Sequence, residues 1–467
     1  MIRTGTRAAA ARPHTGDQAG FGPKFITPLL LGSVLNPINS TMIATALASI
    51  GSELRVGAAQ TAWLVASLYL ASAIGQPAMG RLADLLGPRR VFLAGLVLVC
   101  AAGAVGTFAP ALGWLVVSRV LLGFGTSAAY PAAMALLRAE SERLGRETPR
   151  TVLGLLSLAG LSSAAVGPVL GGLLAATLGW RAIFAVNIPL ALLALVLAML
   201  WLPSGRPSAP GTPRASATLD PLGITLFGAA LTVAMVFLMR LDHPQWLLLP
   251  VLAALGAVLT WWELRRSTPF IDLRMLVRNR ALATTYLRHG IAYLIIYCVM
   301  YGFAQWLEEA HGVSVFDAGL IMLPMSVAAA VCSLLGARTK GIRAPLTLAA
   351  ALLALGSGGL LLAEHSTPLA VVLLIAVVFG LPQGLTATGN QAAVYVQAPP
   401  GGTGAAAGLQ RTAQYLGAIT AASLIGLFYG PRATDAGLHE MAATVGVLSL
   451  VLLILTTADR ALRAKRR

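Results

Sequence analysis

The stretch Gly154 to Gly172, GLLSLAGLSSAAVGPVLGG, decides the fold that we expect for this chain. It carries no charge and is long enough to cross a bilayer, yet it holds more Gly, Ser and Ala than a water-soluble helix tolerates. Ser163, Gly167 and Gly171 are spaced four apart, so small residues follow one helix face and another backbone can approach closely. Pro168 removes a helix hydrogen bond and is expected to bend that face. A membrane helix that simply packs tightly is the alternative.

The rest of the chain is equally apolar. Of 467 residues, 57% are hydrophobic and 11% are charged, and the mean hydropathy is +0.79. These values exclude an ordinary soluble globular protein. About fourteen apolar segments have the length needed to span a bilayer. We therefore expect an all-α membrane protein.

The formal net charge is +16, and the position of the basic residues explains it. Basic residues gather on alternate loops, for example in the segments 138–150 and 265–280, whereas intervening loops carry Glu308, Glu309 and Asp317. The positive-inside rule then places both termini in the cytoplasm of a protein that crosses the plasma (inner) membrane several times. The excess indicates topology and attraction to anionic lipid, and we expect no nucleic-acid partner.

The small-residue stretch also resembles a known motif. Its elements Gly154, Ser163, Gly167-Pro168 and Gly171-Gly172 are similar to the antiporter motif of drug:proton exporters of the major facilitator superfamily, in which Gly stands at the position of Ser163. The resemblance implies two six-helix bundles with two extra central transmembrane helices, as in the fourteen-span members. The expected division is residues 1–24, a cytoplasmic tail; 25–202, the first six-span bundle; 203–218, a linker; 219–263, two additional spans; 264–281, a cytoplasmic amphipathic segment; 282–458, the second six-span bundle; and 459–467, a basic cytoplasmic tail.

The segment from Gly80 to Arg90, GRLADLLGPRR, is expected to form a tight loop in which the Asp84 carboxylate caps a helix or pairs with arginines. A plain charged turn is the alternative. It resembles the signature loop of the superfamily, whose matching positions here are Gly80, Asp84, Gly87, Arg89 and Arg90. The resemblance implies a conformational role, in which the loop latches the two bundles together.

Polar side chains in the first span predict a cavity wall. Asn36 and Asn39 lie at mid-depth, where amides need partners or water; a helix–helix hydrogen-bonding face is the alternative. The surrounding sequence resembles the first-span motif of the fourteen-span exporters, which usually carry Asp where this chain has Asn39. In the fourth span, Arg119 places a guanidinium in the hydrocarbon region and resembles the arginine that the family ties to proton transfer. A buried arginine satisfied by carbonyl groups near the helix end is the alternative.

The ninth span predicts a second cavity wall. His289, Tyr293, Tyr297, Tyr301 and Gln305 recur every four residues, and the positions from His289 to Tyr301 spiral around about 120° of the helix. Tyrosines offer flat faces and hydroxyls to aromatic solutes, although some could belong to an interfacial belt. His289 is a candidate proton carrier, with a satisfied histidine near the cytoplasmic interface as the alternative.

Later spans add Asn390, Gln414 and the intramembrane cation Arg411. Because no clear carboxylate lies at mid-membrane, the pathway is expected to be neutral or positive, which favours neutral or weakly anionic amphiphiles. We therefore expect a secondary transporter that exports small hydrophobic compounds by alternating access; a transporter of one specific metabolite is the alternative. We expect no enzymatic activity, no metal and no cofactor beyond a proton gradient, since the chain lacks a phosphate-binding loop and metal-ligand spacing. The oligomeric state is left open, with a monomer as one option.

Overall fold

The computed structural model describes residues 20–56, 58–203, 220–238, 240–241, 243–313, 315–339, 341–400, 402–430 and 432–462. Every regular element within these ranges is helical. The expected tails and linker fall largely on residues 1–19, 204–219 and 463–467, which lie outside the described residues.

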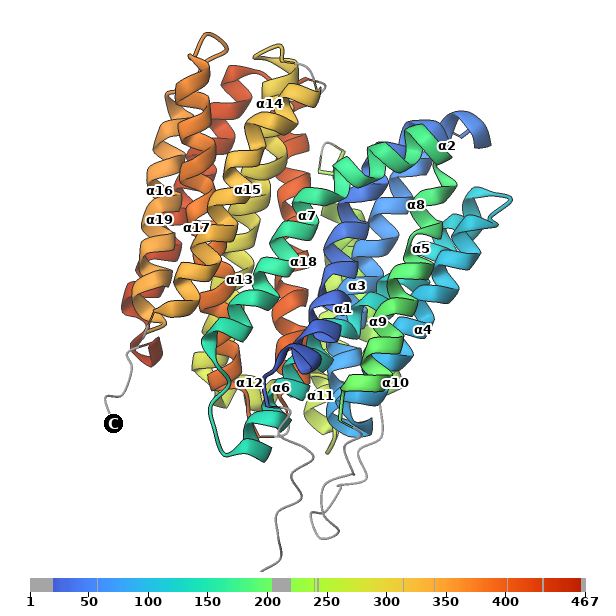
Figure 1. The fold of residues 1–467 in the computed structure, drawn as a ribbon. Helices are drawn as coiled ribbons and strands as arrows, with labels where there is room; N and C mark the ends of the chain where they lie inside the picture. The colour runs from blue at the N-terminus through green and yellow to red at the C-terminus, as the bar shows by residue number, and fades with distance from the viewer. Residues whose placement is uncertain are drawn as a thin grey trace, which may run out of the picture.

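Two helical bundles pack side by side, and each has its own apolar core (Figure 1). The first bundle contains α1 (Pro23–Met42), α2 (Leu47–Leu54), α3 (Ala58–Leu86), α4 (Pro88–Thr107), α5 (Leu112–Ser127), α6 (Ala129–Leu144), α7 (Arg150–Leu178), α8 (Arg181–Ala185) and α9 (Asn187–Trp201). The second contains α13 (Arg280–Tyr297), a π-helical turn at Cys298–Phe303, α14 (Ala304–Glu309), α15 (Val315–Arg338), α16 (Arg343–Leu361), α17 (Leu369–Gln397), α18 (Thr403–Tyr429) and α19 (Asp435–Ala458). Helix α1 begins and α19 ends at the same end of the molecule (Figure 1).

Within the described ranges, ten helices are long and apolar enough to cross a membrane, and the bent helix α7 brings the number to eleven. Three further long helices, α1, α3 and α18, run alongside them (Figure 1). These three carry polar side chains that face the protein interior, such as Asn39, Gln76 and Gln410, and this lowers their hydropathy. Their polar faces follow from the rule that polar groups in a membrane helix need protein or water as partners.

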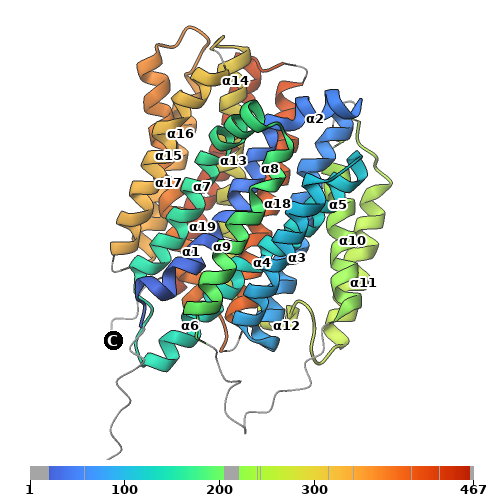
Figure 2. The ribbon, with the colours of Figure 1, turned by 45° about the vertical axis from the view of Figure 1, so that its right-hand side comes forward.

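The two additional helices lie between the two bundles in the sequence, as expected, and at the edge of the first bundle in space. Helices α10 (Pro221–Leu238) and α11 (Leu248–Arg265) form a hairpin at the edge of the first bundle, next to α3 (Figure 2). Along α11, Glu263 alone is buried. The apolar side chains of this hairpin therefore face outward, as expected for helices that contact lipid.

The segment 264–281, which we expected to be amphipathic, contains only a short helix of its own. Its helix α12 (Leu273–Arg278) is only 6 residues long. Phe270 and Ile271 are buried against Ala78 of α3 and Leu409 of α18. The apolar residues of this segment thus pack on protein, in one cluster with residues of α3, α10 and α18.

Helix α7 connects the two bundles. Its axis turns by 45° between Arg150–Ala164 and Val169–Leu178, an interval that contains Pro168. Beyond the bend, a Cβ on Gly167 would lie 1.9 Å from Thr41 Oγ1, and one on Gly171 would lie 2.5 Å from the Met42 carbonyl, so α7 packs against α1 without room for side chains. Before the bend, a Cβ on Gly154 would lie 2.5 Å from Ala337 Cβ of α15. One helix therefore contacts both bundles.

Other members of the expected antiporter motif make fewer contacts. Ser163 is buried and its hydroxyl donates to the Gly160 carbonyl at 2.9 Å. A Cβ on Gly172 would meet nothing within 4 Å. The close packing of this stretch therefore depends on Gly154, Gly167 and Gly171.

Candidate functional site

A cavity lies between the two bundles and encloses about 770 Å³ of empty space, part of it open to solvent. It is lined from the first bundle by α1, α3, α6 and α7, and from the second by α13, the π-helical turn, α17 and α18. The polar lining residues are Asn36, Ser40, Thr41, Tyr69, Tyr130, Ser157, His289, Tyr293, Tyr297, Tyr301, Gln383, Gln391, Gln410, Arg411, Gln414 and Tyr415. The lining combines aromatic faces with hydroxyl, amide and guanidinium groups, which can contact both the apolar and the polar parts of a small molecule.

Aromatic rings form one continuous wall of the cavity. Along α13, the ring centroids of Tyr293 and Tyr297 are 5.8 Å apart, and those of Tyr297 and Tyr301 are 5.7 Å apart with an angle of 8° between the planes. The wall continues across to the first bundle, since the hydroxyls of Tyr69 and Tyr301 are 3.4 Å apart and the rings of Tyr69 and Tyr415 are 5.9 Å apart. The regular spacing on α13 predicted part of this wall.

Tyr69, Tyr130 and Tyr415 were missed by sequence reasoning. Tyr69 and Tyr130 are the single tyrosines of α3 and α6, and Tyr415 shares α18 only with the distant Tyr429, so no periodic pattern marks any of them. The folded chain brings them together from α3, α6 and α18. Their isolated positions show that a cavity wall shared by several helices leaves little signal in any one of them.

Arg411 is the cation of the cavity. Its guanidinium carbon lies 4.1 Å from the centroid of the Tyr130 ring, and Nη1 donates to Gln414 Oε1 at 2.8 Å. Gln414 Nε2 in turn donates to the Tyr297 hydroxyl at 3.0 Å. No Asp or Glu lines the cavity among the residues that the structure describes. The site is therefore aromatic and positively charged.

His289 lines the cavity and is 3% exposed, next to the Tyr293 ring at a centroid distance of 4.6 Å. Neither ring nitrogen has a hydrogen-bond partner among the described residues. The assignment of His289 as a proton carrier stays a prediction, and the structure places its ring on the cavity wall. Its two ring nitrogens are available to a bound molecule, a water or a proton.

Three of the expected cavity residues do not line the cavity. Asn39 is buried beside it, where Nδ2 donates to Asn187 Oδ1 at 2.6 Å and to the Leu35 carbonyl at 2.8 Å. Gln305 donates to Glu309 at 3.1 Å, beyond the cavity. Asn390 accepts a hydrogen bond from Arg288 Nε at 3.0 Å. Each of these amides is therefore engaged with a protein group outside the cavity.

Arg119 is also buried outside the cavity, with 1% of its surface exposed. Nε donates to the Leu64 carbonyl at 2.8 Å and Nη1 donates to the Asn39 carbonyl at 3.0 Å, while Nη2 has no partner within the described chain. No ion pair of Arg119 occurs in the described ranges. Carbonyl groups thus hold this cation where the family usually supplies a carboxylate.

The two bundles meet in a seam on one side of the cavity. Asp84, near the end of α3, accepts hydrogen bonds from the amides of Gly404 and Ala405 at 3.0 and 2.9 Å, and so caps the N-terminus of α18 in the other bundle. A Cβ on Gly80 would lie 2.3 Å from the Gly404 carbonyl, and one on Gly408 would lie 2.3 Å from the Gln76 carbonyl. Only glycine allows the two helices to come this close.

The remaining residues of the signature loop shape the turn that carries Asp84. Gly87 has a φ of +97°, a backbone conformation that favours glycine, and it precedes the first turn of α4. Arg89 donates to the Met199 carbonyl of α9 at 2.9 Å, and Arg90 is exposed. The loop therefore fixes α4 and α9 while Asp84 reaches the other bundle.

Further contacts close the same side of the cavity. The hydroxyls of Thr148 and Tyr395 are 2.6 Å apart, and Ser157 donates to Gln391. Closer to the cavity, the Tyr130 hydroxyl donates to Gln410 Oε1 at 3.2 Å. All of these contacts join residues of different bundles. The opposite ends of the bundles, which carry α2 and α14, diverge from each other (Figure 1).

Comparison with known proteins identifies the family. The family profile "Major Facilitator Superfamily" matches residues 29–422. The chain belongs to the major facilitator superfamily. Its members are transporters that bind small molecules within the membrane.

Individual proteins agree with this assignment. The chain is 32% identical to YwoD, an uncharacterized MFS-type transporter of Bacillus subtilis (strain 168), over 89% of this chain and 92% of YwoD. It is 27% identical to the multidrug efflux pump LfrA of Mycolicibacterium smegmatis, over 86% of this chain and 79% of LfrA. Among solved structures, the human organic anion transporter MFSD10 (TETRAN) aligns with a TM-score of 0.68 at 17% identity, over 93% of this chain and 100% of that one. The last likeness concerns the fold.

Proposed function

We propose that this protein is a secondary active transporter that exports small hydrophobic or amphiphilic compounds, neutral or weakly anionic, in exchange for protons. The observation that carries the proposal is the composition of the cavity, which is lined from both bundles by six tyrosines and by Arg411, with no carboxylate among its described lining residues. Aromatic faces suit apolar ring systems, and a fixed cation disfavours a second positive charge.

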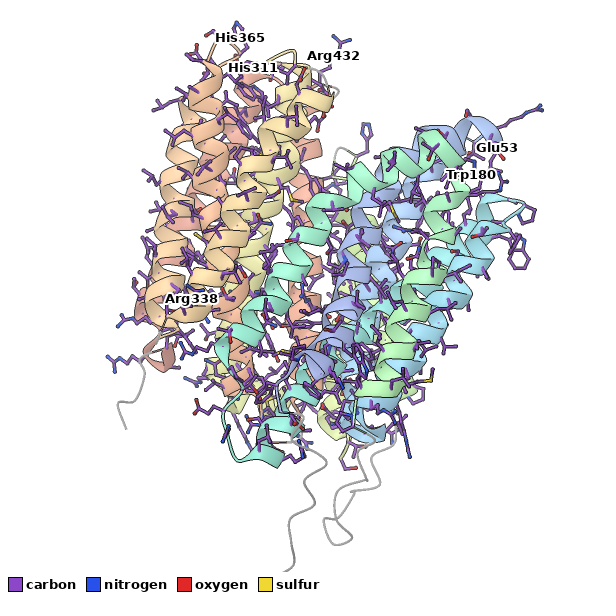
Figure 3. The ribbon with its side chains drawn as sticks, in the orientation of Figure 1. Glu53, Trp180, His311, Arg338, His365 and Arg432 are labelled. Carbon is purple, nitrogen blue, oxygen red and sulfur yellow. The ribbon has the colours of Figure 1, made fainter. Side chains whose placement is uncertain are left out.

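The proposed topology has fourteen spans, as in the fourteen-span drug:proton antiporters. The eleven apolar candidates, together with α1, α3 and α18, give this number. An even number agrees with α1 beginning and α19 ending at one end of the molecule (Figure 1). That end also carries Arg338, whereas His311, His365 and Arg432 lie at the other end of the second bundle (Figure 3). By the positive-inside rule, we place the seam and both termini on the cytoplasmic side of the plasma membrane.

Alternating access follows from this orientation. The seam of Asp84, Gly404 and Ala405 closes the cytoplasmic side, so the described conformation faces outward. The opposite conformation requires this seam to open and the ends that carry α2 and α14 to approach each other (Figure 1). Helix α7, which contacts α1 beyond its bend and α15 before it, is the element about which we propose that the bundles tilt.

For proton coupling, we propose His289 as the group that gains and loses the proton, with Arg119 and Arg411 setting the local positive potential. His289 is the histidine of the cavity, and its ring nitrogens have no partner in the described part of the chain. Histidine changes its charge near neutral pH, which arginine does not. A bound amphiphile would cover the ring and disfavour its charged form, so that proton and substrate exclude each other.

The relatives support export without fixing the substrate. LfrA is a multidrug efflux pump, but only about a quarter of its residues are shared with this chain. A transporter for one specific metabolite, with the same architecture, is the second candidate. The wide aromatic wall favours several substrates, because ring faces impose little geometric selection.

Transport by inverted membrane vesicles tests the proposal. Three matched compounds should be compared: an aromatic carboxylate, its primary amide and a quaternary ammonium analogue. We expect gradient-dependent uptake of the first two, no uptake of the third, and collapse of uptake with a protonophore. Arg411→Gln should reduce uptake of the carboxylate about tenfold, the effect of losing one charge-assisted contact, and affect the amide less.

The matched control is Arg278→Gln, which removes an exposed arginine from α12, far from the cavity lining. It should leave all three rates unchanged. Equal uptake of the quaternary ammonium compound, or unchanged carboxylate uptake in Arg411→Gln, would contradict the proposal. Uptake confined to one compound in a broad panel would favour the single-metabolite alternative.

A further inference from the structure

Two carboxylates are buried together at one end of the α10–α11 hairpin, whose ends lie next to α12 (Figure 2). Asp220 precedes α10 and is 5% exposed, and Glu263, near the end of α11, is 2% exposed. A Cβ on Gly223 would lie 2.8 Å from Asp220 Oδ2 and 2.8 Å from Glu263 Oε1. The two oxygen atoms therefore face the same point on α10.

The two carboxylates differ in their hydrogen bonds. Asp220 accepts from the Gly223 amide at 3.0 Å and from Trp262 Nε1, which lies 3.0 and 2.8 Å from its two oxygens. Glu263 Oε2 accepts from the Ile271 amide at 3.3 Å, whereas Oε1 is buried without a partner among the described residues. Donors stabilise the ionised form of a carboxylate, so Asp220 is the better site for the negative charge.

Within the described residues, no ion pair involves either carboxylate. The neighbouring basic groups are engaged elsewhere, since Arg265 and Arg266 lie 4.3 and 4.4 Å over the rings of Trp261 and Trp262, and Arg274 donates to the Leu264 carbonyl. Asp272, the next acidic group, accepts from the Met275 amide at 2.8 Å. The residues of α3 and α18 that pack on this segment are the apolar Ala78 and Leu409. Within the part of the chain that the structure describes, two buried negative charges would have no ion pair here.

We propose that Asp220 and Glu263 form a proton-binding pair, in which Glu263 carries one proton and Asp220 is ionised. The partnerless Glu263 Oε1 is the atom that holds the proton, and Asp220 Oδ2, on the same side of Gly223, is its acceptor. A protonated carboxyl beside an ionised one avoids the repulsion of like charges and the burial of a second charge.

The pair also acts on the seam between the bundles. Glu263 binds the amide of Ile271, and Phe270 and Ile271 pack against Ala78 and Leu409. Ala78 lies between Gln76 and Gly80 of α3, and Leu409 follows Gly408 of α18, which are the positions of closest contact between the bundles. Loss of the proton places two negative charges at Gly223, and their repulsion moves Glu263 away from Asp220 together with segment 270–273, which Glu263 binds through the Ile271 amide. The pair thus links pH on the seam side to the stability of the seam.

Infrared titration of the purified protein in nanodiscs tests the proton directly. The C=O stretch of a protonated carboxylic acid is separate from the bands of ionised carboxylates. A band from one buried acid should persist at neutral pH in the native protein and disappear in Glu263→Gln. Glu147→Gln, which changes an exposed carboxylate near the same end of the molecule, should leave the band unchanged. A neutral-pH spectrum without this band, or a band retained in Glu263→Gln, overturns the proposal.

Hydrogen exchange tests the link to the seam. After correction for the intrinsic pH dependence of exchange, the amides of 270–276 should lose protection about tenfold when the pH is raised from about 6 to about 9. Glu263→Gln, which keeps the shape of the protonated acid, should remove this loss. Asp220→Asn should also remove this loss of protection, because only one of the two side chains can then be negatively charged. This second variant replaces Glu263→Gln if that variant does not fold. The same pH dependence in the native protein and in either variant contradicts the proposal. Neither readout depends on which compounds the protein transports.

Discussion

Two buried arginines, one in each bundle, are held in different ways. Arg119 in α5 and Arg288 in α13 are each 1% exposed. Arg288 donates to Asp459 Oδ2 at 2.9 Å, to Asn390 Oδ1 at 3.0 Å and to Thr285 Oγ1 at 2.9 Å. Arg119 has two carbonyl acceptors and one nitrogen without a described partner.

The difference separates a structural cation from a functional one. The charge of Arg288 is neutralised by an ion pair that joins α13 to the end of α19, so removing its partner leaves a buried charge. Arg119 is held only by dipoles, so its charge remains to act on whatever enters the neighbouring cavity. Burial of an arginine is thus insufficient evidence of function, and the nature of its partners decides.

The largest effect is expected from breaking the ion pair of Arg288. Asp459→Ala should lower stability by about 3–5 kcal/mol, because it leaves Arg288 buried and unpaired. The measurement is thermal unfolding of the purified protein in detergent, together with the yield. The double variant Arg288→Met/Asp459→Leu should recover most of the loss. A single variant as stable as the native protein would show that solvent already reaches the pair.

A smaller effect on stability, but a larger one on transport, is expected at Arg119. Arg119→Met removes a buried charge that has no ionic partner, so stability should change by less than about 1.5 kcal/mol, while transport falls at least about tenfold. Thermal unfolding and vesicle transport of the same preparation provide the comparison. If stability fell as far as in Asp459→Ala, Arg119 would be a structural cation too.

Supplying the missing carboxylate sharpens the comparison further. Asn39→Asp places a carboxylate on the residue whose backbone carbonyl accepts a hydrogen bond from Arg119 Nη1. Asn36→Asp places one directly on the cavity wall. Both should increase uptake of a quaternary ammonium compound relative to a neutral one, with the larger change for Asn36→Asp, about fivefold, because it faces the cavity. The relative uptake of the two compounds is measured in vesicles. If Asn39→Asp changed the uptake ratio as much as Asn36→Asp or more, Asn39 would have to face the cavity during transport.

The smallest effect belongs to an exposed contact. His365 Nδ1 lies 2.8 Å from Asp435 Oδ2, and both residues lie at the end opposite the seam (His365 in Figure 3). The hydrogen bond with Asp435 raises the pKa of His365 above its ordinary value. Its stabilising effect should therefore be complete below the unfolded-state pKa and be lost as the pH rises through the folded-state pKa.

The native protein and His365→Gln should accordingly differ slightly in thermal midpoint at about pH 5.5 and coincide at about pH 8.5. The measurement is the difference between the thermal midpoints of the native protein and the variant at each of the two pH values. A difference that grew with pH would have the wrong sign for this contact.

Local patterns predicted the parts of the molecule that depend on local spacing. Close contacts of small residues followed from Gly154, Gly167 and Gly171, and the α13 part of the cavity wall followed from the four-residue recurrence of its tyrosines. Features made by distant segments were missed. Asp459 pairs with Arg288 across 171 residues, and no sequence pattern joins the two.

The position of the extra hairpin was also beyond sequence reasoning. Its two helices are apolar on all sides, as lipid-exposed helices are, so the sequence carries no face that would mark a neighbour. Glu263 was a visible exception, a single carboxylate in an apolar helix, and it proved to be the buried residue of α11. An isolated charge in a membrane helix is therefore a better guide to contacts than the apolar residues around it.

Because Asp84 belongs to one bundle and the amides that it caps belong to the other, every opening of the seam leaves the first turn of α18 uncapped. Charge-assisted hydrogen bonds of this kind are each worth about 1.5–3 kcal/mol. Separating the two bundles at the seam therefore costs these two hydrogen bonds, which favours the conformation in which the seam is closed.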